Sequence, residues 1–134
     1  MLSRHKALDI AVATLDQGGA TYHIANDYQP TEGYAVAKYR QYGEFVEHAA
    51  FNEASLLDFV QERLSVFEED PSAFLGTWDN KEGYTNEAGT YFAPGVYLDI
   101  SMVVFDEEVA RQQCQELNEA SYFDFSVMED VMVA

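Results

Sequence analysis

The 134-residue sequence predicts one α+β domain, residues 1–134, with a mainly antiparallel or mixed sheet and three helices packed on one face. Three segments carry hydrophobic residues at helical spacing, and segments rich in aromatic and β-branched residues lie between them. The strand segments alternate apolar with polar residues, which is typical of a sheet with one buried and one solvated face. Because 48% of the residues are hydrophobic, the chain can build a core without a disulfide or a metal.

Each of the three predicted helices begins after a capping residue. The first covers about residues 4–17 and stops at Gly18-Gly19, since glycine readily adopts the left-handed conformation that ends a helix. The second covers about residues 53–68 and ends at Asp70-Pro71, because the residue before a proline is pushed out of the helical region. The third covers about residues 107–117. The expected N-caps are Ser3, Asn52 and Asp106.

Segments with strand character fill the intervals between these helices. Residues 96–104 and 121–127 are the clearest, being rich in aromatic and branched side chains. Residues 80–95 are rich in glycine and polar residues, so we expect either a flap or a longer hairpin there. The strands are expected at residues 21–24, 34–39, 73–79, 96–104 and 121–127.

Two of these strands share a short pattern. Tyr97-Leu98-Asp99-Ile100-Ser101 recurs as Tyr122-Phe123-Asp124-Phe125-Ser126. Side chains alternate across a strand, so the second and fourth residues of each segment are expected to face the core. The Tyr, Asp and Ser residues of each segment are expected on the opposite face. We interpret the pattern as two amphipathic strands of one sheet rather than as a duplication.

The negative charge is concentrated in the later part of the chain. The formal net charge is −17; residues 1–48 hold four basic and six acidic residues, which gives −2, and residues 49–134 hold three basic and eighteen acidic residues, which gives −15. Such a surface repels polyanions and attracts cations. We therefore expect no direct binding of nucleic acid or anionic lipid, since both require surplus positive charge.

The densest acidic positions predict a binding surface for a protein partner with a basic surface. Carboxylates spread over a rigid body can imitate the phosphates of DNA, so a DNA-binding protein is one version of this partner. The alternative is that the acidic residues only keep the protein soluble. The predicted surface consists of Glu68, Glu69, Asp70, Asp106, Glu107 and Glu108.

Three aspartates on or near strands form a second candidate site. Asp79, Asp99 and Asp124 lie in or at the end of separate predicted strands, near the 80–95 segment. Converging carboxylates perturb one another's pKa or bind a hard cation. These residues therefore predict a small ligand-binding or metal-binding enzyme as the alternative to a binding protein, unless they only mark the solvated face of the sheet.

No catalytic residue, cofactor or metal centre is assigned from the sequence. A glycine-rich phosphate loop, a nucleophile elbow and a zinc-protease motif are all missing from it. The histidines, His5, His23 and His48, lack metal-ligand spacing. Cys114 falls on the apolar side of the third predicted helix, where a thiol behaves as a small hydrophobe.

The composition also predicts a compartment. A single cysteine cannot form an internal disulfide, and Asp9 and Asp16 interrupt the apolar stretch that a signal peptide would need. No apolar run approaches the ~20 residues that span a bilayer. We therefore expect a soluble, cytoplasmic protein with no membrane partner.

Several short motifs resemble those of small uncharacterised proteins from bacteriophages and mobile elements. They are Gly18-Gly19-Ala20-Thr21, Pro30-Thr31-Glu32-Gly33-Tyr34-Ala35-Val36, Leu75-Gly76-Thr77-Trp78, Tyr97-Leu98-Asp99-Ile100-Ser101 and, after a helix, Tyr122-Phe123-Asp124. The resemblance implies a phage or mobile-element setting and no particular activity.

Taken together, the sequence favours a non-enzymatic protein that binds a basic partner through its acidic surface. A third class is an oligomeric structural protein, in which the aromatic-rich strands or the 127–134 tail would contact another copy of the chain.

Overall fold

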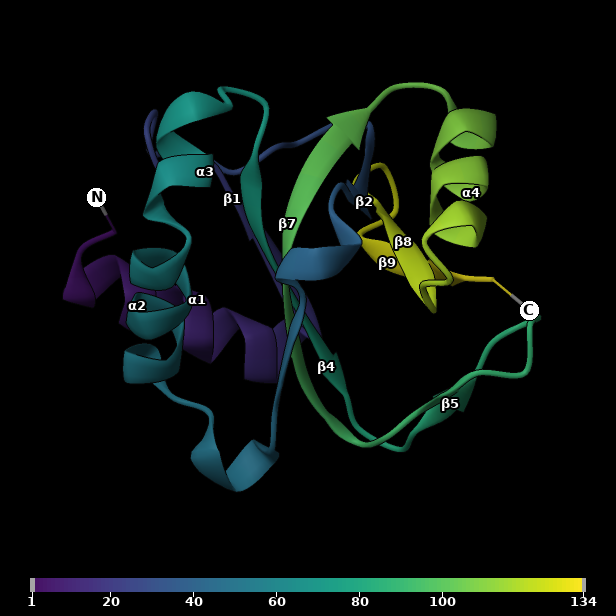
Figure 1. Ribbon diagram of the computed structural model, residues 1–134, viewed down its shortest axis with the longest axis horizontal. Coiled ribbons are helices and arrows are strands. Elements are labelled where there is room, and N and C mark those ends of the chain that lie inside the picture. The colour runs from purple at the N-terminus through teal and green to yellow at the C-terminus, as the bar shows by residue number, and fades with distance from the viewer. Residues whose placement is uncertain (1, 134) are drawn as a thin grey trace.

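Four α-helices and a strongly curled antiparallel sheet make up the residues that the computed structural model describes, which are residues 2–133. The α+β class predicted from the sequence is thus confirmed (Figure 1). The helices are α1 (Arg4–Gln17), α2 (Glu53–Glu62), α3 (Leu64–Glu69) and α4 (Glu107–Glu116). The strands are β1 (Gly19–Tyr22), β2 (Tyr34–Ala37), β3 (Glu44–Val46), β4 (Phe74–Asn80), β5 (Tyr84–Thr85), β6 (Tyr91–Phe92), β7 (Gly95–Val104), β8 (Ser121–Asp124) and β9 (Glu129–Met132). Short 3-10 turns cover Arg40–Tyr42 and His48–Ala50.

The helix ends follow the capping chemistry of the sequence. The Ser3 hydroxyl accepts a hydrogen bond from the Lys6 amide, and Gly18 ends α1 with a left-handed φ of 94°. Asn52 begins α2 in a reciprocal capping box with Ser55. The second predicted helix is divided into α2 and α3 at Arg63, whose φ is −119° and whose guanidinium donates to the Tyr42 carbonyl.

The main sheet has the strand order β1-β4-β7-β2-β8-β9, and β3 also pairs with β7. The strands β4 and β7 form its centre, in a register that joins Phe74 to Ser101 and Asn80 to Gly95. All pairings in this sheet are antiparallel. The sheet curls into a half-barrel, with an outer face that carries the helices and an inner, concave face.

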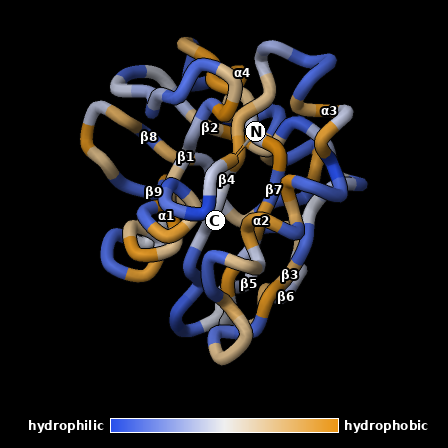
Figure 2. The backbone as a smooth tube through the Cα atoms, turned by 90° about the vertical axis from the view of Figure 1, so that its left-hand side faces the viewer, coloured by the Kyte–Doolittle hydropathy of each residue, from blue (hydrophilic) through white to orange (hydrophobic). Residues whose placement is uncertain are grey.

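Two hydrophobic clusters cover the outer face. The larger cluster lies between α1–α3 and β1, β4 and β7, and includes Leu56, Leu75 and Ile100. The smaller one lies between α4 and β2, β7 and β8, and includes Val36 and Cys114. Figure 2 shows hydrophobic residues along the central strands and α2, and mainly hydrophilic residues in the outer loops. The helices therefore all pack on one face, in two groups on either side of the curl (Figure 1).

The alternation expected for β8 is reversed in the structure. Residues paired across an antiparallel ladder share a face, and Ala35 pairs with both Val103 and Phe123. Phe123 therefore lies on the inner face with Asp99. Tyr122 is 1% exposed in the cluster under α4 instead of lying on a solvated face. Because Tyr122 and Phe123 are both aromatic, the sequence is consistent with either side chain facing the core. Packing against α4 places Tyr122 there.

Residues 80–95 form a longer hairpin rather than a free flap. Strands β5 and β6 pair at Tyr84–Phe92 and Thr85–Tyr91. The Asn80 amide donates to the carbonyls of Phe92 and Ala93, which fixes the base of the hairpin. Asn86 donates to Asn118 after α4, 2.7 Å away. These hydrogen bonds hold the hairpin against the α4–β8 connection.

Candidate functional site

The two predicted acidic runs lie toward the same edge of the sheet. Glu68, Glu69 and Asp70 precede β4, whereas Asp106, Glu107 and Glu108 follow β7. Since β4 and β7 are antiparallel neighbours, the start of one and the end of the other lie at the same edge. Figure 1 shows the end of α3 and the start of α4 along the top of the molecule. We call the side chains of Glu68, Glu69, Asp70, Asp106, Glu107, Glu108 and Asp124 the acidic edge.

Asp70 belongs to this edge but forms a structural ion pair. Its carboxylate accepts hydrogen bonds from Lys38 Nζ at 2.5 Å, Tyr39 Oη at 2.7 Å and Ser72 Oγ at 2.8 Å. Hydrogen bonding by the Lys38 ammonium holds the pKa of Asp70 well below its usual range. Asp70 therefore joins β2, α3 and β4, and its charge is largely neutralised.

Other members of the edge keep their negative charge at the surface. Asp106 caps α4 by accepting from the Glu108 amide, and Glu107 accepts from the buried Tyr122 hydroxyl at 2.9 Å. Both residues are nevertheless exposed, as are Glu68, Glu69 and Glu108. Because these carboxylates are in water, they contribute to the long-range field of the protein.

Asp124 lies at the same edge, on the outer face of the sheet near α4. It pairs with Tyr34 and accepts hydrogen bonds from the Ser126 amide and hydroxyl. Burial raises the pKa of Tyr34, and the charges of Glu107, Asp124 and Asp106 raise it further. Carboxylates from β8 and α4 thus act on one phenol, although they are far apart in the sequence.

An exposed phenylalanine projects from the acidic edge. Phe105 lies between β7 and α4 and is 72% exposed. Its ring lies over Gly33, where an added Cβ would approach the ring at 3.0 Å. Val127 and Met128, in the turn after Asp124, are also exposed. Large exposed apolar side chains among charged residues are characteristic of protein-binding surfaces.

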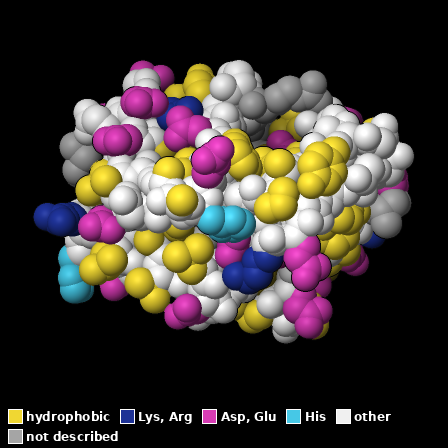
Figure 3. Space-filling model, turned by 90° about the horizontal axis from the view of Figure 1, so that it is seen from below, with side chains coloured by type: hydrophobic (Ala, Val, Ile, Leu, Met, Phe, Trp, Pro, Cys, Tyr) yellow, Lys and Arg dark blue, Asp and Glu magenta, His cyan; other side chains and the backbone are white. Residues whose placement is uncertain are grey.

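The opposite edge of the molecule also carries acidic side chains. Seen from below, Asp and Glu side chains are scattered over it among hydrophobic and uncharged side chains, with Lys or Arg and His side chains between them (Figure 3).

Asp79 lies toward this opposite edge and has its own partners. Its side chain is 2% exposed and accepts from Lys81 Nζ at 2.7 Å, with His48 Nε2 2.6 Å away. It pairs with Val96, so it shares the outer face with Leu98 rather than the inner face with Asp99. Asp79, Asp99 and Asp124 therefore do not converge, and the three-aspartate site considered from the sequence is not formed.

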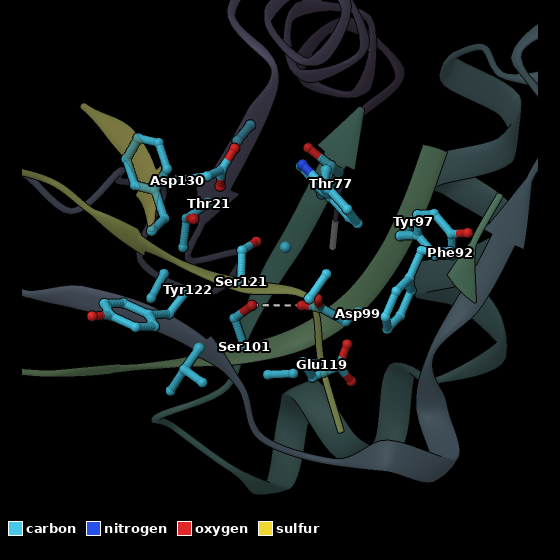
Figure 4. A pocket seen from close by; sticks show the side chains of 18 residues that line it. Thr21, Thr77, Phe92, Tyr97, Asp99, Ser101, Glu119, Ser121, Tyr122 and Asp130 are labelled. Atoms are coloured by element: carbon cyan, nitrogen blue, oxygen red, sulfur yellow. Dashed lines mark hydrogen bonds between the residues drawn. The ribbon is translucent and has the colours of Figure 1, made fainter. Parts of the chain in front are cut away.

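Asp99 alone of the three lines the concave pocket. The pocket has a volume of about 70 Å³ and is formed by the inner faces of β1, β2, β4, β7, β8 and β9. Figure 4 shows Asp99 beside Ser101, with Phe92 and Tyr97 toward one end and Thr21 and Asp130 toward the other. The Ser101 hydroxyl donates to Asp99 Oδ1 at 2.5 Å. Desolvation raises the pKa of Asp99, and the Ser101 hydrogen bond partly opposes this effect.

Asp130 is a pocket residue that the sequence reasoning did not identify. It lies on β9 opposite Phe123, and this register directs it to the inner face. Although it is exposed at the rim, surrounding protein desolvates its carboxyl group and raises its pKa to about 6. Side chains alternate along a strand, which indicates that Asp130 and Met132 share a face. The sequence does not reveal which strand pairs with β9.

The remaining candidates provide no reactive group. Cys114 is fully buried on the inner side of α4, and desolvation raises the pKa of its thiol to about 12, so the thiolate is negligible at neutral pH. His23 is buried and packs against Phe74, while His5 lies on α1 next to Asp9. Across residues 2–133 no group of three or more His, Cys, Asp and Glu side chains is arranged to hold a metal ion.

Comparisons with known proteins assign no function to this chain. No family model, curated protein or solved structure matches this chain. In the part of the chain that the structure describes, no helix is long and apolar enough to cross a membrane.

Proposed function

We propose that this chain is a non-enzymatic, cytoplasmic binding protein that engages a basic protein surface through its acidic edge. The observation that carries this proposal is Phe105, an exposed aromatic side chain next to Asp106, Glu107 and Glu108. An apolar anchor within a charged rim is the usual arrangement of a specific protein interface.

The two components have separate physical roles. The exposed carboxylates attract a cationic partner over several ångströms and orient it, which mainly raises the association rate. Burial of the Phe105 ring then contributes apolar contact area, which mainly slows dissociation. Asp70 has no direct role in this scheme, since Lys38 already neutralises it.

A DNA-binding protein of the host cell is the version of this partner that fits the resemblance to phage and mobile-element proteins. Its DNA site is basic and accepts a rigid array of negative charge. In that version the protein competes with DNA for its partner, and the competition weakens as salt screens the charges.

The test uses charge-reversal variants with a matched control. The edge variant combines Glu68→Lys, Glu69→Lys and Glu108→Lys, and the control combines Asp16→Lys, Asp58→Lys and Glu82→Lys. All six residues are exposed, so both variants change the net charge equally. A second pair compares Phe105→Ser with Tyr91→Ser, because Tyr91 is an exposed aromatic residue on the β5–β6 hairpin.

Immobilised wild-type protein is expected to retain a basic protein from lysate of the source cells and to release it at ~0.5 M salt, where the Debye length is only about 4 Å. The purified partner should bind the edge variant and Phe105→Ser at least ~10-fold more weakly, a loss of about 1.4 kcal/mol, and both controls normally. Equal losses in edge and control variants would show general charge attraction and contradict the proposal.

A further inference from the structure

The half-barrel is open, and one side of β9 has no partner strand. Among residues 2–133, β9 is the last strand of the sheet and pairs only with β8. The Val133 amide donates to the Ala120 carbonyl, so these two residues form a hydrogen-bonded pair next to the β8–β9 ladder. Such pairs alternate along an antiparallel ladder. The backbone N–H and C=O groups of Asp130 and Met132 therefore point away from β8.

A groove follows this free side of β9. It consists of a hollow of about 60 Å³ beside Met128 and Asp130, the concave pocket of about 70 Å³, and a third hollow of about 320 Å³ beside Met132. The first two share Thr21 and Asp130, and the last two share Trp78. The other wall of the groove belongs to β1 and β4. Free backbone groups along a groove are a template for an added strand, because an extended chain satisfies them.

Aromatic rings line the middle of this groove. Trp78 stacks on Tyr97 with ring centroids 5.4 Å apart, and Phe92 meets both rings nearly edge-on. All three rings line the concave pocket and are half-buried. Side chains of a strand point alternately to opposite faces, so every second side chain of an added strand faces these rings. Apolar side chains at those positions gain contact area there.

Charge decides which kind of chain the groove accepts. Glu129 and Asp130 are exposed on β9, and the exposed Glu82 lines the third hollow. Lys81 is the one Lys, Arg or His among the described residues that line the three hollows, and it is hydrogen-bonded to Asp79. Opposite charges across a strand pair are favourable, and like charges are unfavourable. A basic segment is therefore favoured over an acidic one.

A second copy of the chain is a poor occupant of this edge. Two antiparallel β9 strands related by a twofold axis would bring Glu129 and Asp130 of both copies together. Each copy also carries a net charge of −17. Charged residues on an edge strand commonly prevent such self-pairing.

We propose that β9 binds an extended, basic segment of a protein partner by strand addition, with the segment lying in the groove between β9 and β1. The segment exchanges backbone hydrogen bonds with Asp130 and Met132. Its Lys or Arg side chains lie beside Glu129 and Asp130, and its apolar side chains face Trp78. This surface does not require the acidic edge, so it can be tested independently of the function proposed above.

The first test uses capped hexapeptides in which Lys or Arg alternates with Val, Ile or Phe, in both phases. Trp78 is the single tryptophan and lines the groove, so its fluorescence measures Kd. An acidic control replaces each Lys or Arg by Glu. Two backbone controls keep the charge and carry N-methyl groups on alternate residues, which removes the N–H donors of one side of the peptide or of the other.

Saturable binding of the basic peptides is expected. The acidic control and one of the two N-methylated forms should bind at least ~10-fold more weakly, because they lose the charge pairing or the backbone donors. The other N-methylated form should bind nearly normally, since its missing donors lie on the side away from β9. This asymmetry distinguishes strand addition from general charge attraction.

Amide hydrogen exchange, measured by NMR, locates the paired strand. A saturating basic peptide should slow exchange at the amides of Asp130 and Met132 at least ~10-fold, because these amides then donate to the peptide. The amide of Glu47, in the exposed segment after β3, should exchange at an unchanged rate.

Variants of β9 provide a third test. Met132→Pro removes an N–H that points away from β8, a change that edge strands tolerate, and should raise Kd for the basic peptides about tenfold. Met132→Ala controls for loss of the side chain. Glu129→Lys should raise Kd about threefold by reversing a cross-strand charge pair. Asp58→Lys, the same charge change at an exposed position of α2, should leave Kd nearly unchanged.

The proposal would be overturned by equal binding of acidic and basic peptides, by equal binding of both N-methylated forms, or by unprotected amides at Asp130 and Met132. It would also be overturned if no basic peptide bound saturably, or if a wild-type dimer protected the same two amides without peptide. The combined Glu68→Lys, Glu69→Lys and Glu108→Lys variant should lose the partner of the acidic edge and keep the peptide affinity within about threefold at ~0.15 M salt, where distant charges are screened.

Discussion

Carboxyl groups lie in opposite environments at the acidic edge and in the concave pocket. At the edge, Glu68, Glu69 and Glu108 are exposed, and Asp70 has a full set of donors around it. In the pocket, Asp99 has one hydroxyl donor and Asp130 has only desolvation acting on its pKa. The edge therefore carries charge that water or Lys38 stabilises, whereas desolvation disfavours the charged forms of Asp99 and Asp130 in the pocket.

This difference shows that total charge is a poor guide to function. Asp70 and Asp130 contribute equally to the net charge of −17, yet their pKa values shift in opposite directions. A carboxylate stabilises the fold where donors meet it and destabilises the fold where none does.

Asp70→Asn should lower the free energy of unfolding by about 1 to 2 kcal/mol at neutral pH, because Lys38 loses its counter-ion while solvent still reaches the pair. The folded pKa of Asp70 lies below its unfolded value of 3.8, so its contribution is complete above that value. The contribution disappears as the pH falls toward the folded pKa.

Urea denaturation of wild type and variant at several pH values would measure this effect. Glu69→Gln, one residue earlier and exposed, is the matched control and should be nearly neutral. If the difference in the free energy of unfolding between wild type and Asp70→Asn stayed constant below about pH 3, it would contradict the ion-pair explanation.

Asp130→Asn should change the free energy of unfolding in the opposite direction. The folded pKa of about 6 lies above the usual value of 3.8, so the fold favours the protonated form. The Asp130 carboxyl group therefore makes its full contribution to the stability of the wild-type protein below pH 3.8. This contribution is lost as the pH rises through about 6. Because the residue is solvent-accessible, the free energy of unfolding of the variant should exceed that of wild type by only about 0.5 to 1 kcal/mol at pH 8 and should equal it at pH 4.

Thermal unfolding of Asp130→Asn at these two pH values would test the prediction, with Glu129→Gln as the neighbouring control on β9. Destabilisation of Asp130→Asn at pH 8 would mean that the carboxylate has a stabilising partner in solution.

The smallest effect is expected at the exposed edge. Glu68 and Glu69 lie in the last turn of α3, where negative charge opposes the helix dipole. Replacing both by Gln should raise stability by about 0.3 to 0.5 kcal/mol at low salt, and by less as salt screens the charges. A loss of more than about 1 kcal/mol would reveal that these side chains have structural partners.

Several elements follow directly from local sequence. The caps Ser3, Asn52 and Asp106 set the starts of α1, α2 and α4, because a capping hydrogen bond involves only neighbouring residues. The strand region 96–104 was predicted within one residue of β7. The break at Arg63 was missed, since its partner Tyr42 lies twenty-one residues earlier.

The candidate sites were only partly accessible to prediction. The acidic runs were visible as sequence, but the sequence does not show that they lie at one edge or that Lys38 neutralises Asp70. Asp99 was selected, yet as one of three aspartates that the fold separates. Asp130 was overlooked because the phase of β9 is fixed by its pairing with β8.

By itself, the sequence determined the helix starts, the hydrophobic content of the core and the negative charge of the surface, because each depends on residue type or on near neighbours. The tertiary structure alone decided which carboxylates meet a cation, which face a confined space, and where Gly76 leaves room for Asp99. Those outcomes depend on strand register and curl, and a shift of one residue along a strand moves every side chain to the other face.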